Sequence, residues 1–142
     1  MGKFRATYPY LGYILKSKAE LEVAKNCQKA KLDWTYETVK VTWTPPPTKD
    51  KTYTPDFIIK RKDKTTLLVE YKEFLDSRSK RVLRYATKQN PDLDIRILFG
   101  PRCSKKKIRK GSKTTYAEWA DKYKIPHAEG RIVPKEWIKI GG

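Results

Sequence analysis

The sequence has little of what most zinc or nucleophile chemistry requires, because its 142 residues include only two cysteines and one histidine. Cys27 and Cys103 lie far apart without a CxxC spacing, so a zinc site lacks soft ligands. Ser-His-Asp and Cys-His catalysis would both need His127, which lies in a Pro- and Gly-flanked stretch. A catalytic metal would therefore be a hard, oxygen-bound cation such as Mg²⁺ or Mn²⁺.

Long apolar runs are also missing. No stretch approaches the roughly 18 apolar residues of a membrane-spanning helix, and the N-terminus shows no signal-peptide core. We therefore expect an intracellular protein without a membrane partner.

Acidic residues are scarce as well, with 16 against 33 lysines and arginines, for a formal net charge of +17. A protein with this much self-repulsion usually binds a polyanion, and nucleic acid is the commonest one. By charge alone, an acidic membrane surface would be the competing partner. The 38% apolar content allows one compact domain with a core.

The order of the expected elements predicts a mixed α/β fold with a central β-sheet flanked by helices. Residues 1–16 show no clean period and are expected to form a basic arm, with 17–142 as a single domain and the proline-rich 44–51 as a bridge. The elements we expect are a helix over 17–31, extended structure over 34–43, strands over 53–60 and 66–72, a helix over 76–89, a strand over 93–99, a short helix over 114–123 and a closing element over 134–138.

The first expected helix carries a glutamate on its core side. Ser17 is a suitable N-cap, and Glu20 lies at the third helical position, which predicts a capping box. Helical spacing places Glu20 on the face of Val23 and Cys27, whereas Glu22 faces solvent.

Charged residues on two adjacent expected strands are the candidates for catalytic chemistry. Asp56 follows Pro55, and Glu70 and Lys72 share one face of the neighbouring strand. Two carboxylates can hold Mg²⁺, which stabilises the transition state of phosphodiester hydrolysis, and a lysine can orient the attacking water. Ordinary cross-strand ion pairing is the structural alternative.

Several strings of the sequence resemble the phage endonuclease I family of Holliday-junction resolvases, part of the PD-(D/E)xK nuclease superfamily. The similarity runs from about residue 17 to residue 139, with the motifs in the same order. The strings are Thr52-Tyr53-Thr54-Pro55-Asp56-Phe57, Val69-Glu70-Tyr71-Lys72, Asn90-Pro91-Asp92-Leu93-Asp94-Ile95-Arg96-Ile97, Lys110-Gly111-Ser112 and Pro134-Lys135-Glu136-Trp137-Ile138-Lys139.

The resemblance implies a site and a substrate. Asp56 would bind two Mg²⁺ (or Mn²⁺) ions, Glu70 and the Tyr71 backbone carbonyl would bind one of them, and Glu20 would complete the ligand set. Lys72 would be the catalytic lysine. No small-molecule cofactor is expected. The substrate would be four-way and other branched DNA, and the protein would act in the cytoplasm of a phage-infected host.

The resemblance also implies an intertwined homodimer that exchanges part of each protomer across residues 44–51. Three consecutive prolines would make this segment a stiff spacer. Glu20 would then come from one chain and Asp56, Glu70 and Lys72 from the other, and the two composite sites would make paired cuts. An ordinary monomeric loop is the alternative.

Two basic segments are candidates for phosphate contacts, with binding that is sensitive to salt and largely indifferent to sequence. One is the helix after the site and the other is the loop over 101–113. The residues are Arg78, Lys80, Arg81, Arg84 and Lys88 on the helix, and Lys105, Lys106, Lys107, Arg109 and Lys110 on the loop. No zinc finger, helix-turn-helix or RNP pattern appears, and this absence suits an enzyme that reads DNA shape.

Two other functions stay open at this point. One is a PD-(D/E)xK nuclease that nicks or cuts linear duplex DNA. The other is a non-catalytic DNA-binding protein in which the carboxylates are structural. The proline bridge and the end-to-end resemblance favour a junction resolvase over the first, and the four intact site residues argue against the second.

Overall fold

A five-stranded sheet lies at the centre of the computed structural model, which describes residues 6–44 and 51–139. Its strands run in the order β3 (Asp33–Tyr36), β6 (Phe57–Lys60), β7 (Thr66–Lys72), β8 (Asp94–Phe99) and β9 (His127–Glu129). The pairs β3–β6 and β6–β7 are antiparallel, whereas β7–β8 and β8–β9 are parallel. The expected mixed α/β fold is confirmed, and β9 is a strand that the sequence analysis missed.

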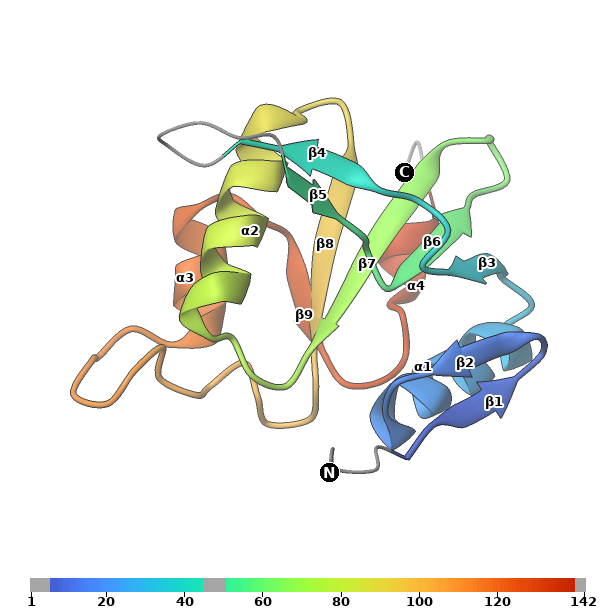
Figure 1. Cartoon of the computed structure of the whole chain (residues 1–142), viewed down its shortest axis with the longest axis horizontal. Helices are drawn as coiled ribbons and strands as arrows, with labels where there is room; N and C mark the ends of the chain where they lie inside the picture. Colours follow the sequence, from blue (N-terminus) through green and yellow to red (C-terminus); the bar gives the residue numbers. More distant parts are fainter. Residues whose placement is uncertain (1–5, 45–50, 140–142) are drawn as a thin grey trace, which may run out of the picture.

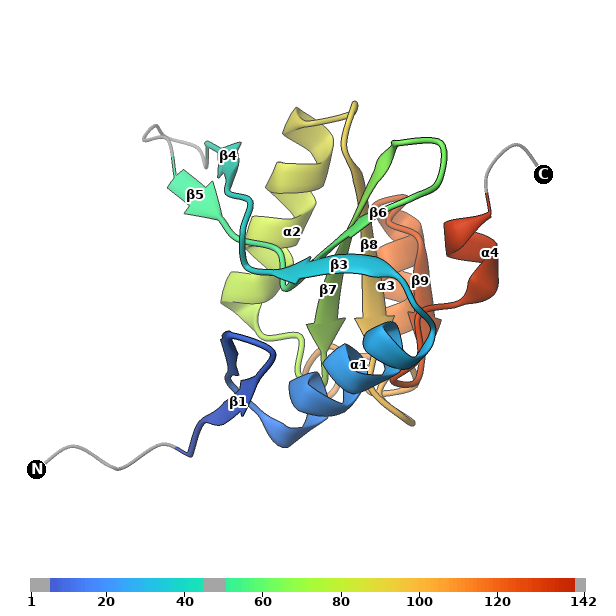
Figure 2. The same cartoon turned by 90° about the vertical axis from the view of Figure 1, so that its right-hand side faces the viewer.

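Helices cover both faces of this sheet (Figures 1 and 2). Helices α1 (Lys18–Lys29) and α4 (Lys135–Ile138) pack on one face, and α2 (Ser77–Gln89) and α3 (Tyr116–Lys122) pack on the other. The middle of β7 is apolar on both sides because each face is buried. Within the described ranges no helix is long and apolar enough to cross a membrane.

Two expected extended segments are each interrupted. The segment over 34–43 divides into β3 and β4 (Val41–Trp43), and the segment over 53–60 divides into β5 (Lys51–Tyr53) and β6. Strands β4 and β5 form a separate antiparallel hairpin beside α2. Pro55 explains the second interruption, since it has no N–H to donate to a ladder. The prolines of the expected bridge fall in 45–50, outside the described residues.

The N-terminal segment differs from the basic arm that we expected. Strands β1 (Tyr8–Tyr10) and β2 (Tyr13–Leu15) form an antiparallel hairpin. The ring centroids of Tyr10 and Tyr13 lie 6.4 and 5.4 Å from that of Trp34, and Leu15 is fully buried. These apolar contacts tie the hairpin to the core, so the described part of this segment is structured. Residues 1–5 lie outside the described chain.

A buried arginine fixes the last helix against the sheet. The Arg61 Nε donates to the Trp137 carbonyl at 2.7 Å, and its Nη2 pairs with Asp94 Oδ2 at 2.8 Å. Because both partners are present, the buried guanidinium charge is compensated. The basic residue therefore belongs to the scaffold.

Candidate active site

The pairing register of the sheet brings two acidic residues together. Phe57 pairs with Val69 in the β6–β7 ladder, so Asp56 lies opposite Glu70 by continuation of the register. Asp56 is 5% exposed and Glu70 is 6% exposed. The Tyr71 amide donates to Asp56 Oδ2 at 2.9 Å. The expected meeting of the two carboxylates is observed, although Asp56 lies just before β6 rather than within a strand.

Glu70 is held by neighbours on both of its carboxylate oxygens. The hydroxyl of Tyr53, at the end of β5, donates to Oε1 at 2.9 Å. The ammonium of Lys72, two residues along the same face of β7, lies 3.3 Å from Oε2. The expected shared face of Glu70 and Lys72 is therefore present, and Tyr53 adds a contact that the sequence did not reveal.

Burial perturbs both carboxyl groups. It raises the pKa of Asp56 well above its usual value, and the negative charges of Glu70 and Glu20 raise it further. Burial likewise raises the pKa of Glu70, although Lys72 and the Tyr53 hydrogen bond oppose the shift. Two buried acids side by side are unfavourable when both are ionised, so the pair favours a bound proton or a cation.

Glu20 lies at the start of α1, close to the acid pair. Its amide donates to Ser17 Oγ at 3.0 Å, which confirms the N-cap. Its carboxylate instead accepts hydrogen bonds from the Lys16 amide at 3.2 Å and the Tyr36 hydroxyl at 2.5 Å. The reciprocal half of the expected capping box is thus replaced by contacts that direct Glu20 towards the site.

Within one chain, Glu20, Glu70 and Lys72 all lie within electrostatic reach of Asp56. A second ion pair lies beside them, between the Lys16 ammonium and the Glu37 carboxylate. The Glu37 amide donates to the Asp56 carbonyl at 3.0 Å, so this pair adjoins the acid pair. Burial alone would lower the pKa of Lys16, but the negative charges of Glu37, Asp56 and Glu20 together outweigh burial and raise that pKa. The sequence around Lys16 and Glu37 has no helix or strand periodicity that would identify either residue as part of a site.

The acid pair does not by itself form a full set of metal ligands. Within 6–44 and 51–139, no three His, Cys, Asp or Glu side chains lie close enough together to hold a metal ion. Asp56 and Glu70 still offer oxygen ligands of the type that Mg²⁺ prefers. That ion commonly takes one or two carboxylates and keeps several waters. The donor chemistry therefore fits a hard divalent cation.

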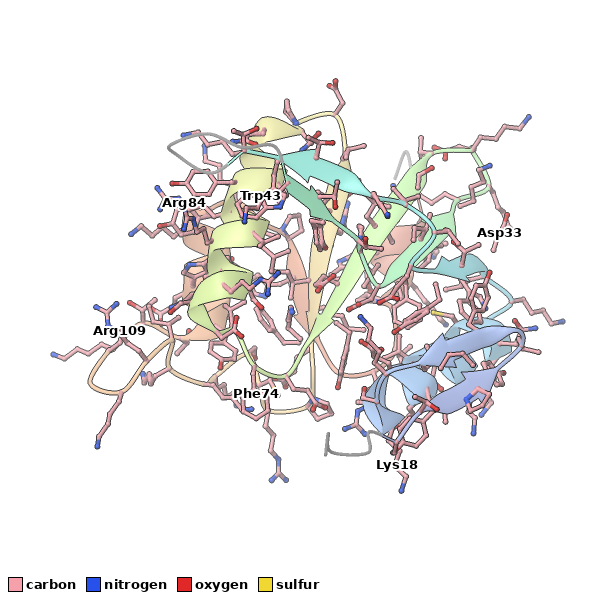
Figure 3. All side chains as sticks on the ribbon, viewed as in Figure 1. Lys18, Asp33, Trp43, Phe74, Arg84 and Arg109 are labelled. Atoms are coloured by element: carbon pink, nitrogen blue, oxygen red, sulfur yellow. The ribbon has the colours of Figure 1, made fainter. Side chains whose placement is uncertain are left out.

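A basic groove of about 600 Å³ lies between α2, the loop that precedes α3, and α3 itself. Figure 3 shows Arg84 on α2 and Arg109 on the loop at the same side of the molecule. The Arg84 guanidinium lies over the rings of Tyr85, at 5.3 Å, and Tyr123, at 4.8 Å. The basic residues that line the groove are Lys80, Arg81, Arg84, Arg109 and Lys122.

Four of the ten expected DNA contacts thus line one groove, and Lys122 is an addition. Two of the others make contacts within the protein. The Lys106 ammonium donates to the Glu73 carbonyl at 2.9 Å, and the Lys107 ammonium donates to the Lys113 carbonyl at 3.1 Å.

A mixed sheet that brings a Pro-Asp dipeptide opposite a Glu-x-Lys tripeptide defines a nuclease of the PD-(D/E)xK type. A sequence profile described as "Phage endonuclease I" matches residues 1–141. The chain is 35% identical to "Endonuclease I" of Escherichia phage T7 over 124 residues, which cover 87% of this chain and 78% of that protein. It is 30% identical to "Endodeoxyribonuclease 1" of Enterobacteria phage T3 over 128 residues, which cover 90% of this chain and 79% of that protein. The chain belongs to the phage endonuclease I family and is a nuclease.

Proposed function

We propose that the chain is a Mg²⁺-dependent endodeoxyribonuclease that resolves four-way and other branched DNA by paired cuts, in the cytoplasm of an infected host. The observation that carries the proposal is the buried pair of Asp56 and Glu70 beside Lys72. Two acids with raised pKa values are costly in a scaffold, but they suit a cation site at which phosphate is cut.

Different sets of site residues would bind the two cations. Asp56, Glu70 and the backbone carbonyl of Tyr71 would hold one ion, and Asp56 and Glu20 would hold a second. Mn²⁺ is an alternative to Mg²⁺ because both prefer oxygen ligands. When bound, a divalent cation neutralises charge on the phosphodiester transition state and lowers the pKa of a water.

Lys72 supplies positive charge next to the carboxylates. Its ammonium would orient the attacking water and would donate to the phosphate oxygens where negative charge develops. The Tyr53 hydroxyl fixes Glu70, and the Tyr36 hydroxyl fixes Glu20. Both carboxylates are thereby oriented before the substrate arrives, which limits reorganisation during the reaction.

The proposal includes a homodimer that exchanges elements across the proline segment. Glu20 precedes this segment in the sequence, and Asp56, Glu70 and Lys72 follow it. Exchange of an identical element between two protomers would preserve the contacts that one chain makes internally. Two such sites related by two-fold symmetry would cut opposing strands of a branch.

DNA would be recognised by its shape and backbone. The charge of +17 and the groove lined by Lys80, Arg84 and Lys122 suit phosphate contacts. These contacts carry no sequence information, so branch geometry would decide where the enzyme binds. Nicking or cutting of linear duplex DNA is the second candidate, since the same acid pair and lysine would serve it.

Cleavage of a labelled immobile four-way junction, beside the matching linear duplex, tests the proposal. Each substrate is incubated with Mg²⁺ and with EDTA. We expect paired, metal-dependent cuts near the branch with the duplex spared. Equal cutting of the duplex would establish the second candidate, and tight junction binding without cutting in Mg²⁺ or Mn²⁺ would mean that the proposed chemistry is wrong.

A further inference from the structure

An exposed aromatic ring lies just beyond the active-site strand. Phe74 follows Lys72 by two residues and is 72% exposed. The other large apolar residues exposed in the described chain are aliphatic, and they are Leu11, Ile14, Leu93 and Ile132. Single exposed apolar residues are common, so exposure alone gives no function. The way in which Phe74 is held gives further evidence.

The chain on both sides of Phe74 is anchored. The Glu73 carboxylate accepts from the Tyr71 hydroxyl at 2.8 Å, and the Glu73 carbonyl accepts from Lys106 Nζ at 2.9 Å. On the other side, Leu75 is only 1% exposed, and Asp76 caps α2. The phenylalanine side chain therefore projects into solvent from a backbone that is fixed by its neighbours (Figure 3).

A cation accompanies the ring. The ammonium of Lys106 lies 4.2 Å from the ring centroid of Phe74. Lys106 belongs to the loop that also contributes Arg109 to the basic groove. An aromatic face with an adjacent positive charge is the combination that binds a nucleotide with its base stacked and its phosphate neutralised.

We propose that Phe74 stacks on a base at the branch point of the DNA, next to the phosphate that is cut. This inference rests on the proposed function. Inside a continuous duplex both faces of each base are covered by neighbouring bases, so a protein ring finds no face to contact. At a branch point the stack is interrupted, and the ring covers the face that becomes free. Phe74 would thus contribute to selection of branched over linear DNA.

The position of the ring suits this role. Two residues of extended chain span at most about 7 Å, so the Phe74 backbone lies close to Lys72. A base stacked on the Phe74 ring and a phosphate at the acid pair would then belong to the same short stretch of one DNA strand. Lys106 would contact the phosphate of the stacked nucleotide or of its neighbour.

The test compares Phe74→Ala, Phe74→Leu and Phe74→Trp with wild-type protein, with Ile132→Ala as the control at a position that is 66% exposed. The fluorescence of 2-aminopurine at the branch of a four-way junction is measured in Ca²⁺ or EDTA. The kcat/KM ratio of junction to linear duplex is measured in Mg²⁺. Thermal unfolding of each variant is measured to test whether the variant retains the fold.

We expect Phe74→Ala and Phe74→Leu to lose the fluorescence change and to reduce the junction-to-duplex ratio by about tenfold or more. Phe74→Trp and Ile132→Ala should behave as wild type. A selective wild-type enzyme whose Phe74→Ala variant keeps the full ratio would overturn the stacking role alone, as would a Phe74→Leu variant with wild-type behaviour. A wild-type enzyme without junction selectivity would instead overturn the proposed function.

Discussion

The hydroxyl of Tyr53 donates to Oε1 of Glu70 at 2.9 Å, across the boundary between the β4–β5 hairpin and the central sheet. Tyr53 ends the strand that follows the proline-rich segment, and Glu70 lies on the central strand β7. Burial and the adjacent carboxylate charges raise the pKa of Tyr53, so its hydroxyl remains a donor at all ordinary pH values. The orientation of Glu70 therefore depends on the placement of the hairpin.

Removal of this hydroxyl should weaken the cation site. Tyr53→Phe is expected to reduce Mn²⁺ affinity about tenfold, the usual effect of losing a hydrogen bond to a charged group. The hydrogen bond also lowers the pKa of Glu70, so the acid limb of the pH–rate profile should move to higher pH. Calorimetric titration with Mn²⁺ measures the affinity. Tyr10→Phe, on the N-terminal hairpin, is the matched control and should leave both quantities unchanged.

Lys72 should be required for cleavage and dispensable for binding. We expect Lys72→Ala to reduce the single-turnover rate on a junction at least about a hundredfold, as loss of a positive charge at a developing anion usually does. Junction affinity should change little, because many other basic residues are expected to contact the DNA backbone. Gel-shift titration and quenched-flow cleavage measure the two effects, with the exposed Lys62→Ala as control. A Lys72→Ala enzyme that cuts at the normal rate would contradict the assignment of the site.

The acid pair should make the metal-free protein less stable as pH rises. The pKa values of Asp56 and Glu70 are raised in the folded chain, so between the unfolded value of about 4 and the raised values the folded state binds more protons. In EDTA, the free energy of unfolding should therefore fall as pH rises through this window. Thermal unfolding at about pH 5 and about pH 7.5 measures the trend.

Asp56→Asn removes one of these carboxylates and should reduce this pH dependence. At neutral pH in EDTA it should also raise the free energy of unfolding by about 1–3 kcal/mol, since one of two adjacent buried acids is replaced by a neutral amide. The same variant should gain no stability from added Mg²⁺. If wild type and Asp56→Asn show the same pH trend, the acid pair is not its source.

The groove beside α2 should bind DNA through phosphates. Arg84→Ala and Lys122→Ala, which remove groove residues, are each expected to weaken junction and duplex binding to a similar extent. Each should reduce the slope of log K against log salt by about one. Fluorescence anisotropy at several salt concentrations measures this slope. Because Lys62 lies in the turn between β6 and β7, Lys62→Ala should keep the wild-type slope if the groove is the binding surface.

Much of the site was predictable because it follows from local rules. Strand alternation placed Glu70 and Lys72 on one face, and helical spacing placed Glu20 towards the core, where its carboxylate meets Tyr36. The antiparallel pairing of β6 and β7 then brought Asp56 opposite Glu70. Each of these inferences needs only the sequence and the geometry of one helix or hairpin.

The contacts that the sequence did not reveal join residues through tertiary packing. In the sequence, Tyr53 and Tyr36 look like ordinary aromatic residues of strands. Only the fold directs their hydroxyls to the carboxylates of the active site. The hairpin over residues 8–15 was missed because three-residue strands are too short for a clear period. Strand β9 is equally short, and it pairs with a distant parallel strand, so local pattern could not identify it.

The pairing order of the sheet sets when the site can form during synthesis. Strand β7, which carries Glu70 and Lys72, takes β6 as its neighbour on one side and β8 on the other. β8 ends only at Phe99, and its own outer neighbour β9 ends at Glu129. A growing chain therefore lacks a completed sheet until the residues up to Glu129 have left the ribosome. An endonuclease built in this way completes the sheet that carries Glu70 only after the helices α1, α2 and α3 have all been synthesised.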